Sequence, residues 1–187
     1  MLSTVINYRR ANTSDSSGIA KVLVNTWKST YFNLVSESIL NKRKYENIEP
    51  RWRERIENLT EKDIMFVAEK EDKKIVGITW GRTEKLNIAE HLPEIDEYEG
   101  ELLAVYVLKD YQKRNIGKTL VSQVVEFLLN HNVHSMIVWV FKENSSKEFY
   151  KKLGAKYIGD RFLDLDGEKY LESVYGWMSI EDILSSI

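Results

Sequence analysis

Two runs of residues with a strand-like hydrophobic pattern lie in the middle of the chain. "IMFVAEK" and "IVGITWGRT" flank the polar stretch "EDKK", which predicts an antiparallel hairpin. "ELLAVYVL" and "SMIVWVF" are apolar nearly throughout, which is typical of strands buried on both faces. "VINYRRA" predicts a short first strand, and "AKYIGDRFLDLDGEKYLESVYGWM" predicts two closing strands around Asp166-Gly167.

Other segments have the spacing of amphipathic helices. In "NTSDSSGIAKVLVNTWKSTYFNLV", Ile19, Leu23 and Trp27 recur at intervals of three or four residues. "GKTLVSQVVEFLLNH" has a continuous apolar face, and "SSKEFYKKLG" predicts a short helix that ends at Gly154. Residues 36–60 predict helical pieces interrupted near Pro50, because proline disfavours a helical conformation in the residue before it.

The order of these elements predicts the fold class. The predicted order is one strand, helices, three strands, a helix, a strand, a helix and two strands. The first strands of the sheet form a meander. We therefore expect residues 1–187 to form one α/β domain, with a mixed, mostly antiparallel sheet flanked by helices. The meander is not typical of a doubly wound dinucleotide-binding fold.

Composition narrows the function classes. The 187 residues carry a net charge of −2, which gives no electrostatic reason to expect a nucleic acid or an anionic membrane as partner. The absence of cysteine excludes disulfides, thiolate metal sites and a cysteine nucleophile. Neither a signal peptide nor an apolar run of about 20 residues is evident, so we expect a cytoplasmic protein.

The stretch "DYQKRNIGKTL" contains the Gly-Lys-Thr that ends a P-loop. A P-loop also needs a glycine at 112, where this chain has Gln112, and the G-x-G-x-x-G fingerprint is absent too. A strand, a tight basic turn and a helix that opens at Gly117 still form a candidate anion site at a helix N-terminus. Asn115 tolerates left-handed backbone angles better than most residues.

Two motifs carry a resemblance to a known family. "YVLKDYQKRNIGKTL" resembles the acyl-CoA pyrophosphate loop of the GNAT superfamily of N-acetyltransferases, [QR]-x-x-G-x-[GA], with Asn115 in place of the first glycine. "WVFKENSSKEFYKKLGAKYIG" resembles the second GNAT signature, and "NTWKSTYFNLV" resembles the amine-side helix of bacterial members. The resemblance implies a GNAT-like domain that transfers an acetyl group directly from acetyl-CoA to an amine, without a metal.

The resemblance also implies which residues hold acetyl-CoA. Backbone groups of one strand would pair with the pantetheine arm, loop residues would hold the pyrophosphate, and a side chain after the next strand would bond the pantetheine amide. The strand residues are Val105, Tyr106 and Val107, and the side chain after the next strand is that of Asn144. The loop residues are Gln112, Lys113, Arg114, Asn115, Ile116, Gly117 and Lys118.

Glu101 and Tyr150 are the predicted catalytic residues. An alkyl amine has a pKa of about 10, so a base must remove a proton before the amine attacks. The resemblance implies Glu101 as this base; a two-residue period would place it on one face with Val105 and Val107 unless a bulge intervenes. Phe149 is expected to face the core, and Tyr150 to point about 100° away, towards the CoA sulfur.

The acceptor and the partners are less defined by the sequence. An acidic run leads into the strand that carries the predicted base, and its negative charge favours a polyamine, a lysine side chain or a similar cationic amine as acceptor. The run consists of Glu94, Asp96, Glu97, Glu99 and Glu101 itself. Trp27 and Tyr31 are either core residues or the lining of an acceptor pocket. A homodimer is expected only by analogy with the family.

Two alternative functions stay open. One is a non-catalytic regulator that binds acyl-CoA, against which Glu101 and Tyr150 argue. The other is a nucleotide-dependent phosphotransferase, against which Gln112 argues. His91, His131 and His134 have no metal-ligand spacing with carboxylates, so we expect no metal site.

Overall fold

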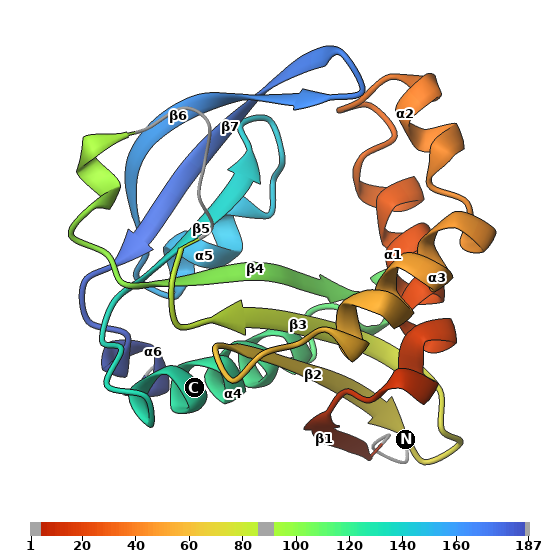
Figure 1. Ribbon diagram of the computed structural model, residues 1–187, viewed down its shortest axis with the longest axis horizontal. Helices are drawn as coiled ribbons and strands as arrows, with labels where there is room; N and C mark the ends of the chain where they lie inside the picture. Colours follow the sequence, from red (N-terminus) through yellow and green to blue (C-terminus); the bar gives the residue numbers. More distant parts are fainter. Residues whose placement is uncertain (1–4, 86–91, 186–187) are drawn as a thin grey trace.

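The computed structural model describes residues 5–85 and 92–185 (Figure 1). Its strands form one seven-stranded sheet in the order β1-β2-β3-β4-β5-β7-β6, in which only β4 and β5 are parallel neighbours. The strands are β1 (Ile6–Arg10), β2 (Asp63–Lys70), β3 (Ile75–Arg82), β4 (Gly100–Val107), β5 (Met136–Phe141), β6 (Lys156–Leu165) and β7 (Glu168–Trp177). The predicted α/β fold with a mixed, mostly antiparallel sheet is confirmed.

Both predicted hairpins are present. β2 pairs antiparallel with β3, and β6 pairs antiparallel with β7. The β6–β7 turn contains Asp166 and Gly167, whose φ angles are +56° and +87°. Two successive positive φ angles match the twist of antiparallel strands, and Asp-Gly is among the residue pairs that adopt them most readily.

Helices cover both faces of the sheet. The longer ones are α1 (Ser16–Thr30), α3 (Tyr45–Glu57) and α4 (Ile116–Leu129); the short ones are α2 (Glu37–Lys42), α5 (Lys147–Lys152) and α6 (Glu181–Ser185). The apolar face of α4 packs with Leu102 and Val138 in one core cluster, which also contains Tyr150 of α5. α1 and α3 form a second cluster against Met65 and Ile78 on the opposite face (Figure 1).

The predicted break near Pro50 is wrong, because α3 continues through this residue. Proline removes one backbone hydrogen bond from the helix, which disfavours it at this position. Ile48, Trp52 and Ile56 are all buried by packing on the second core cluster. Burial of these three side chains outweighs the local preference of proline, and the solvent-exposed position of Pro50 avoids a clash with the core.

β4 and β5 separate after a short parallel contact. Their register covers only Gly100–Leu102 against Met136–Val138, after which β5 pairs with β7 alone. Among the described residues, Val105 and Val107 have a strand partner only on the β3 side. The β5-facing edge of β4 therefore presents backbone N–H and C=O groups to the space between the two strands.

A bulge in β4 reverses the side-chain alternation at Leu103. Trp80 is opposite Ala104 while the next β3 residue, Gly81, is opposite Leu102, so Leu103 is the extra residue. Leu102 and Val107 both pack in the α4 cluster, although they are five positions apart. One extra residue changes which face each following side chain takes.

Candidate functional site

A cavity of about 470 Å³ opens where β4 and β5 separate. β4 contributes Leu103 to Val107, β5 contributes Val138 to Val140, and α1, the loop before α4 and the α5 region complete the wall. The remaining lining residues are Thr26, Thr30, Tyr31, Gln112, Lys113, Asn115, Gly117, Lys118, Asn144, Ser145, Ser146, Phe149, Tyr150 and Lys152. The structure thus brings most of the predicted cofactor residues to one cavity.

The loop between β4 and α4 has the backbone form of an anion cradle. Lys113 and Asn115 have φ angles of +59° and +61°, so the left-handed conformation predicted for Asn115 is present. Asn115 is the residue immediately before α4, whose first turn contains Gly117 and Lys118. The first N–H groups of a helix lack partners within the helix, so this turn can donate to phosphate oxygens.

Gly117 keeps this helix turn accessible. A Cβ atom at this position would lie 3.4 Å from Cζ of Phe149. A methyl group would therefore fit in ordinary van der Waals contact with this ring, and neither space nor backbone angles require the glycine. Any longer side chain would have to project into the cavity.

Two of the predicted loop residues do not line the cavity. Ile116 is only 3% exposed and packs in the α4 cluster, and the guanidinium of Arg114 lies 5.5 Å from the ring centre of Tyr111. Ile116 can contribute only its backbone to a bound anion. Arg114 supplies positive charge near the opening.

Asn144 is buried and caps the turn before α5. Its Oδ1 accepts a hydrogen bond from the Ser146 backbone at 2.9 Å, and its side chain also interacts with the hydroxyl of Tyr31. Ser146 is the N-cap residue of α5, and its own side chain forms no capping hydrogen bond with the helix. Asn144 thus connects the loop after β5 to α1 across the cavity.

The expected orientation of α5 is correct only in part: Phe149 packs against the α4 cluster as expected, but Tyr150 is buried in the same cluster. Tyr150 is the more buried of the two aromatic residues, at 7% exposure, whereas Phe149 is partly buried and lies against Gly117. Packing against Trp177 in an edge-to-face contact at 6.2 Å explains the burial of Tyr150. Both residues line the cavity, and burial raises the pKa of Tyr150 well above its usual range.

A cluster of aromatic hydroxyls around Tyr106 was not predicted. We expected Tyr106 to act through its backbone, yet its side chain hydrogen-bonds with those of Trp27 and Tyr31. Trp27 and Tyr31 stack with their ring centres 4.2 Å apart. Burial raises the pKa values of Tyr31 and Tyr106, so both hydroxyls stay protonated at neutral pH. Side chains alternate between the two faces of β4, so Tyr106 points to the face opposite Val105 and Val107. This alternation is the sequence signal that could have predicted a side-chain role for Tyr106.

Glu101 is placed on the face opposite to the one expected. A Cβ at Gly100 would meet Leu128 of α4, and Leu102 packs in the α4 cluster, so Glu101 between them points to the α1 and α3 face. The Leu103 bulge leaves Val107 and Val105 on the α4 side. Glu101 is 5% exposed and does not line the cavity, although it lies two residues from Leu103, which does.

Trp139 and two charged residues border the other side of the cavity. The guanidinium of Arg161 lies 3.6 Å from the ring centre of Trp139 and donates twice to Glu172, at 2.9 and 3.1 Å. Burial raises the pKa of Glu172, and the nearby Arg161 opposes this effect. No local sequence signal pointed to this ion pair, because its residues lie on β6 and β7 and meet Trp139 only through sheet pairing.

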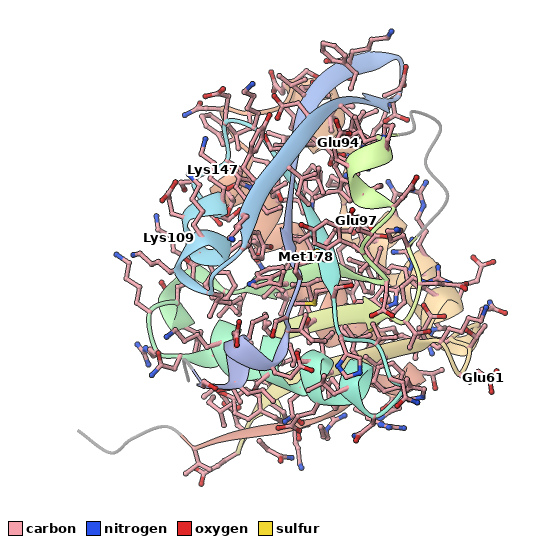
Figure 2. The ribbon with its side chains drawn as sticks, turned by 90° about the vertical axis from the view of Figure 1, so that its left-hand side faces the viewer. Glu61, Glu94, Glu97, Lys109, Lys147 and Met178 are labelled. Atoms are coloured by element: carbon pink, nitrogen blue, oxygen red, sulfur yellow. The ribbon has the colours of Figure 1, made fainter. Side chains whose placement is uncertain are left out.

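The acidic segment 92–99 packs over β5 and β7 through Ile95 and Tyr98. Glu99 accepts hydrogen bonds from the His134 and Ser135 backbones, at 2.6 and 3.3 Å. Figure 2 shows Glu94 and Glu97 on one side of the molecule, with Lys109 and Lys147 on the other. Negative charge thus gathers beside the start of β4, and positive charge beside the loop before α4.

The two histidines in the described part of the chain, His131 and His134, do not line the cavity. His131 and His134 contact the Phe127 carbonyl and the Glu181 carboxylate, and His91 lies outside the described residues. In the part of the chain that the structure describes, no group of three His, Cys, Asp or Glu residues is arranged to bind a metal. Nor does any helix within 5–85 and 92–185 combine the length and apolar character needed to cross a membrane.

Comparisons with known proteins agree with this architecture. The model of the Acetyltransferase (GNAT) family matches residues 18–155. The uncharacterized N-acetyltransferase YuaI of Bacillus subtilis is 30% identical over 173 residues, which are 92% of this chain and 93% of the relative. A spermidine N(1)-acetyltransferase of Thermoplasma acidophilum is 26% identical over 172 residues, which are 90% of this chain and 99% of the relative.

Solved structures share the fold at lower identity. The PaiA N-acetyltransferase of Thermoplasma acidophilum in complex with coenzyme A matches with a TM-score of 0.61 and 22% identity, over 90% of this chain and 98% of that chain. A ribosomal-protein-alanine N-acetyltransferase of Brucella melitensis matches with a TM-score of 0.64 and 19% identity, over 91% and 98%. With the family match over residues 18–155 and a relative at 30% identity, this chain belongs to the GNAT acetyltransferase family.

Proposed function

We propose that this protein transfers the acetyl group of acetyl-CoA directly to a primary amine. The separation of β4 and β5 beside the left-handed loop at Asn115 is the observation that carries the proposal. The gap between the two strands is bordered by backbone groups of β4, and it lies next to the N-terminus of α4, which can bind a pyrophosphate. The coenzyme A complex of the PaiA N-acetyltransferase, which shares the fold, supports the same cofactor.

The residues of the cavity fit the parts of CoA. Backbone N–H groups from Gln112 to Lys118 would hold the pyrophosphate, with Lys113 and Lys118 adding positive charge. Backbone groups along the β5-facing edge of Val105 to Val107, other than the Val107 carbonyl that accepts from Gln112, would pair with the amides of the pantetheine arm. When bound, acetyl-CoA would supply a thioester carbonyl carbon for attack by the amine, with the C–N bond forming as the C–S bond breaks and CoA leaves as its thiolate.

Glu101 is the residue that we propose as the base. An amine that arrives as an ammonium must lose a proton, and a carboxylate within hydrogen-bonding reach or one water away can accept it. Glu101 is buried near the point where β4 and β5 separate, on the face covered by α1 and α3. The acceptor would therefore approach from that face.

Tyr150 is the residue that we propose as the acid. Its hydroxyl must protonate the CoA sulfur as the thiolate leaves. Because burial raises its pKa well above the usual range, Tyr150 keeps its proton throughout the neutral range. Tyr106 and Tyr31 are further hydroxyls near it, and they are candidates to orient the reacting groups.

The acidic segment supports an acceptor that is cationic in solution, such as a polyamine or a lysine-like amine. Glu94, Asp96 and Glu97 are exposed beside the start of β4, where their field would concentrate ammonium ions. The name of the Thermoplasma relative, a spermidine N(1)-acetyltransferase, also supports a cationic amine.

The test combines CoA binding with turnover. Calorimetry with CoA and with ATP should show binding of CoA only, and release of free thiol from acetyl-CoA should require an amine from a panel. Replacing Glu94 and Glu97 by Gln should slow cationic amines at low salt, with less effect at 0.5 M salt, because the screening length falls from about 10 Å at 0.1 M. Tight CoA binding without thiol release for any amine would favour a non-catalytic regulator, and binding of ATP alone would reject the proposal.

A further inference from the structure

A second cavity of about 470 Å³ lies beside the predicted base, and the proposed function does not use it. Its lining residues come from the C-terminal half of α3, from residues 58–60 that follow it, and from the adjoining ends of β2 and β3. Three arginines, Arg51, Arg55 and Arg82, line it. The carboxylates among its lining residues are Glu54 and Asp63.

Arg55 is held in place by aromatic rings rather than by an acid. Its guanidinium lies 4.9 Å from the ring centre of Trp52 and 4.8 Å from that of Trp80. Within residues 5–85 and 92–185 it forms no ion pair, whereas Arg53 on the same helix pairs with Glu49 at 3.2 Å. Stacking orients a guanidinium and leaves its in-plane N–H groups available to another acceptor.

Arg51 and Arg43 add positive charge to the same face. Arg51 is four residues before Arg55, so the two side chains are neighbours on the surface of α3. The guanidinium of Arg43 lies 4.1 Å from the ring centre of Trp27. Burial lowers the pKa values of Arg43 and Arg55, and the like charge of Arg51 lowers both further. Neither Arg43 nor Arg51 has an ion pair within the described part of the chain.

The buried carboxylate of this cavity is already engaged. Asp63 accepts hydrogen bonds from Trp80 Nε1 at 3.2 Å and from Thr60 Oγ1 at 2.7 Å, and it forms an ion pair with Arg82 at 3.6 Å. Arg82 Nε is buried and has no hydrogen-bond partner among the described residues. Glu54, the other carboxylate, is exposed on α3. Asp63 therefore offers little charge with which to balance Arg51 and Arg55.

The cavity is close to the proposed reaction centre. Arg82 is the cross-strand partner of Glu101, and Trp80 is the partner of Ala104, which lines the cofactor cavity. Neighbouring strands are about 4.8 Å apart, so directly paired side chains project together on one face. Arg82 therefore places one wall of the arginine-lined cavity next to Glu101 on the same face of the sheet, although Glu101 itself does not line that cavity.

We propose that this cavity binds an anionic group of the acceptor, a carboxylate or a phosphate, held by Arg55 and Arg51 while the amine of the same molecule faces Glu101. This inference rests on the proposed function and narrows its substrate class. The acceptor is then bipolar, with an ammonium end and an acidic end, as in a free amino acid of the lysine type. A linear polyamine would instead place a second ammonium among the arginines, which is unfavourable.

Matched amines test the carboxylate and the phosphate separately. Lysine and cadaverine differ only in the α-carboxylate, and phosphoethanolamine and ethanolamine differ only in the phosphate. The anionic member of at least one pair should have a kcat/KM about 10 to 100 times higher, which corresponds to one hydrogen-bonded charge pair. Arg55→Gln and Arg51→Gln should each remove most of this advantage, mainly through KM. Arg53→Gln, on the same helix but paired with Glu49, should leave it unchanged.

A binding measurement that needs no turnover separates the two ideas. With saturating CoA present to occupy the cradle before α4, inorganic phosphate or glutarate should raise the melting temperature of the wild-type protein and of Arg53→Gln, but not that of Arg55→Gln. If no amine supports thiol release, the proposed function fails, and the ligand-induced melting shift alone still decides whether the anion site exists. If thiol is released equally with both members of each pair, or if cadaverine and spermidine are the better substrates, the assignment of this cavity to the acceptor is overturned.

Discussion

The side-chain amide of Gln112 donates a hydrogen bond to the carbonyl of Val107 at 3.0 Å, which joins the loop before α4 to the end of β4. Gln112→Ala should weaken CoA binding about fivefold, because one hydrogen bond contributes about 1 kcal/mol and the loop would lose a fixed position. Calorimetric titration with CoA measures this change.

Gln123→Ala is the matched control for this prediction. Gln123 is on the same helix, α4, and its side chain interacts with Glu126 at the surface. CoA affinity should be unchanged in this variant. An equal loss in both variants would mean that Gln112 does not position the loop.

Gly117→Asp should lower CoA affinity at least about tenfold. The new carboxylate would project into the cavity at the helix N-terminus, where it would compete with the pyrophosphate and repel it. Gly117→Ala provides the control, because its methyl group meets Phe149 Cζ at 3.4 Å without adding charge. A folded Gly117→Asp protein that binds CoA as tightly as the wild type would refute the phosphate site.

Glu101→Gln should reduce kcat by on the order of 10² or more, since it removes the proposed proton acceptor without changing the size of the side chain. The reduction should be largest at low pH, where most of the amine is protonated. Asp72→Asn, at an exposed residue paired with Lys70 in the β2–β3 turn, should have no such effect. Equal pH–rate profiles for the wild type and Glu101→Gln would exclude Glu101 as the base.

Tyr150→Phe should slow turnover and leave the Kd for acetyl-CoA almost unchanged, because only the hydroxyl is lost and the ring still packs against Trp177. Stopped-flow measurement of thiol release separates this effect from binding. Tyr157→Phe, at a tyrosine that is 56% exposed on β6, is the control. Wild-type rates in Tyr150→Phe would show that another group protonates the sulfur.

Arg9→Met should destabilise the fold by roughly 2–4 kcal/mol at pH 7, because it leaves two buried carboxylates without their cation. Arg9 donates to both oxygens of Asp15 at 2.8 Å and to Glu69 at 2.9 Å, which connects β1, the start of α1 and β2. Denaturant unfolding measures the loss. Arg53→Met, which breaks a helix-surface pair, should change stability by less than about 0.5 kcal/mol.

The pH dependence of the Arg9 effect has a defined sign. Hydrogen bonding to Arg9 lowers the pKa of Glu69 in the folded protein. The Arg9–Glu69 interaction therefore stabilises the folded protein above the unfolded glutamate pKa of about 4.3, and this stabilisation is lost as the pH falls through the lower pKa of folded Glu69. The stability difference between wild type and Arg9→Met should shrink below pH 4, and a constant difference down to pH 2 would contradict this origin.

The sequence alone was enough to predict the strands, the main helices and the left-handed turn before α4. These features depend on local properties: the apolar runs of β2 and β3 around a polar turn, the apolar face of α4, and the tolerance of Asn115 for a positive φ. The family motifs also have short, continuous spacing. Such signals are readable because each involves residues close together in the chain.

Tertiary structure alone decided which way several side chains point. The bulge at Leu103 depends on the register between β3 and β4, and it turns Glu101 away from Val105 and Val107. Pro50 is tolerated because Ile48, Trp52 and Ile56 are buried on the sheet, and Tyr150 is buried because Trp177 of β7 packs against it.

The arginine-lined cavity has the same non-local origin. Arg55 of α3 meets Trp80 of β3 only when α3 packs on the sheet, and Arg82 meets Glu101 only through strand pairing. Local spacing specifies the type and limits of an element, because hydrogen bonds and hydrophobic periodicity act within a few residues. Strand register and helix packing join residues far apart in the chain, and these contacts determine which charges share a cavity.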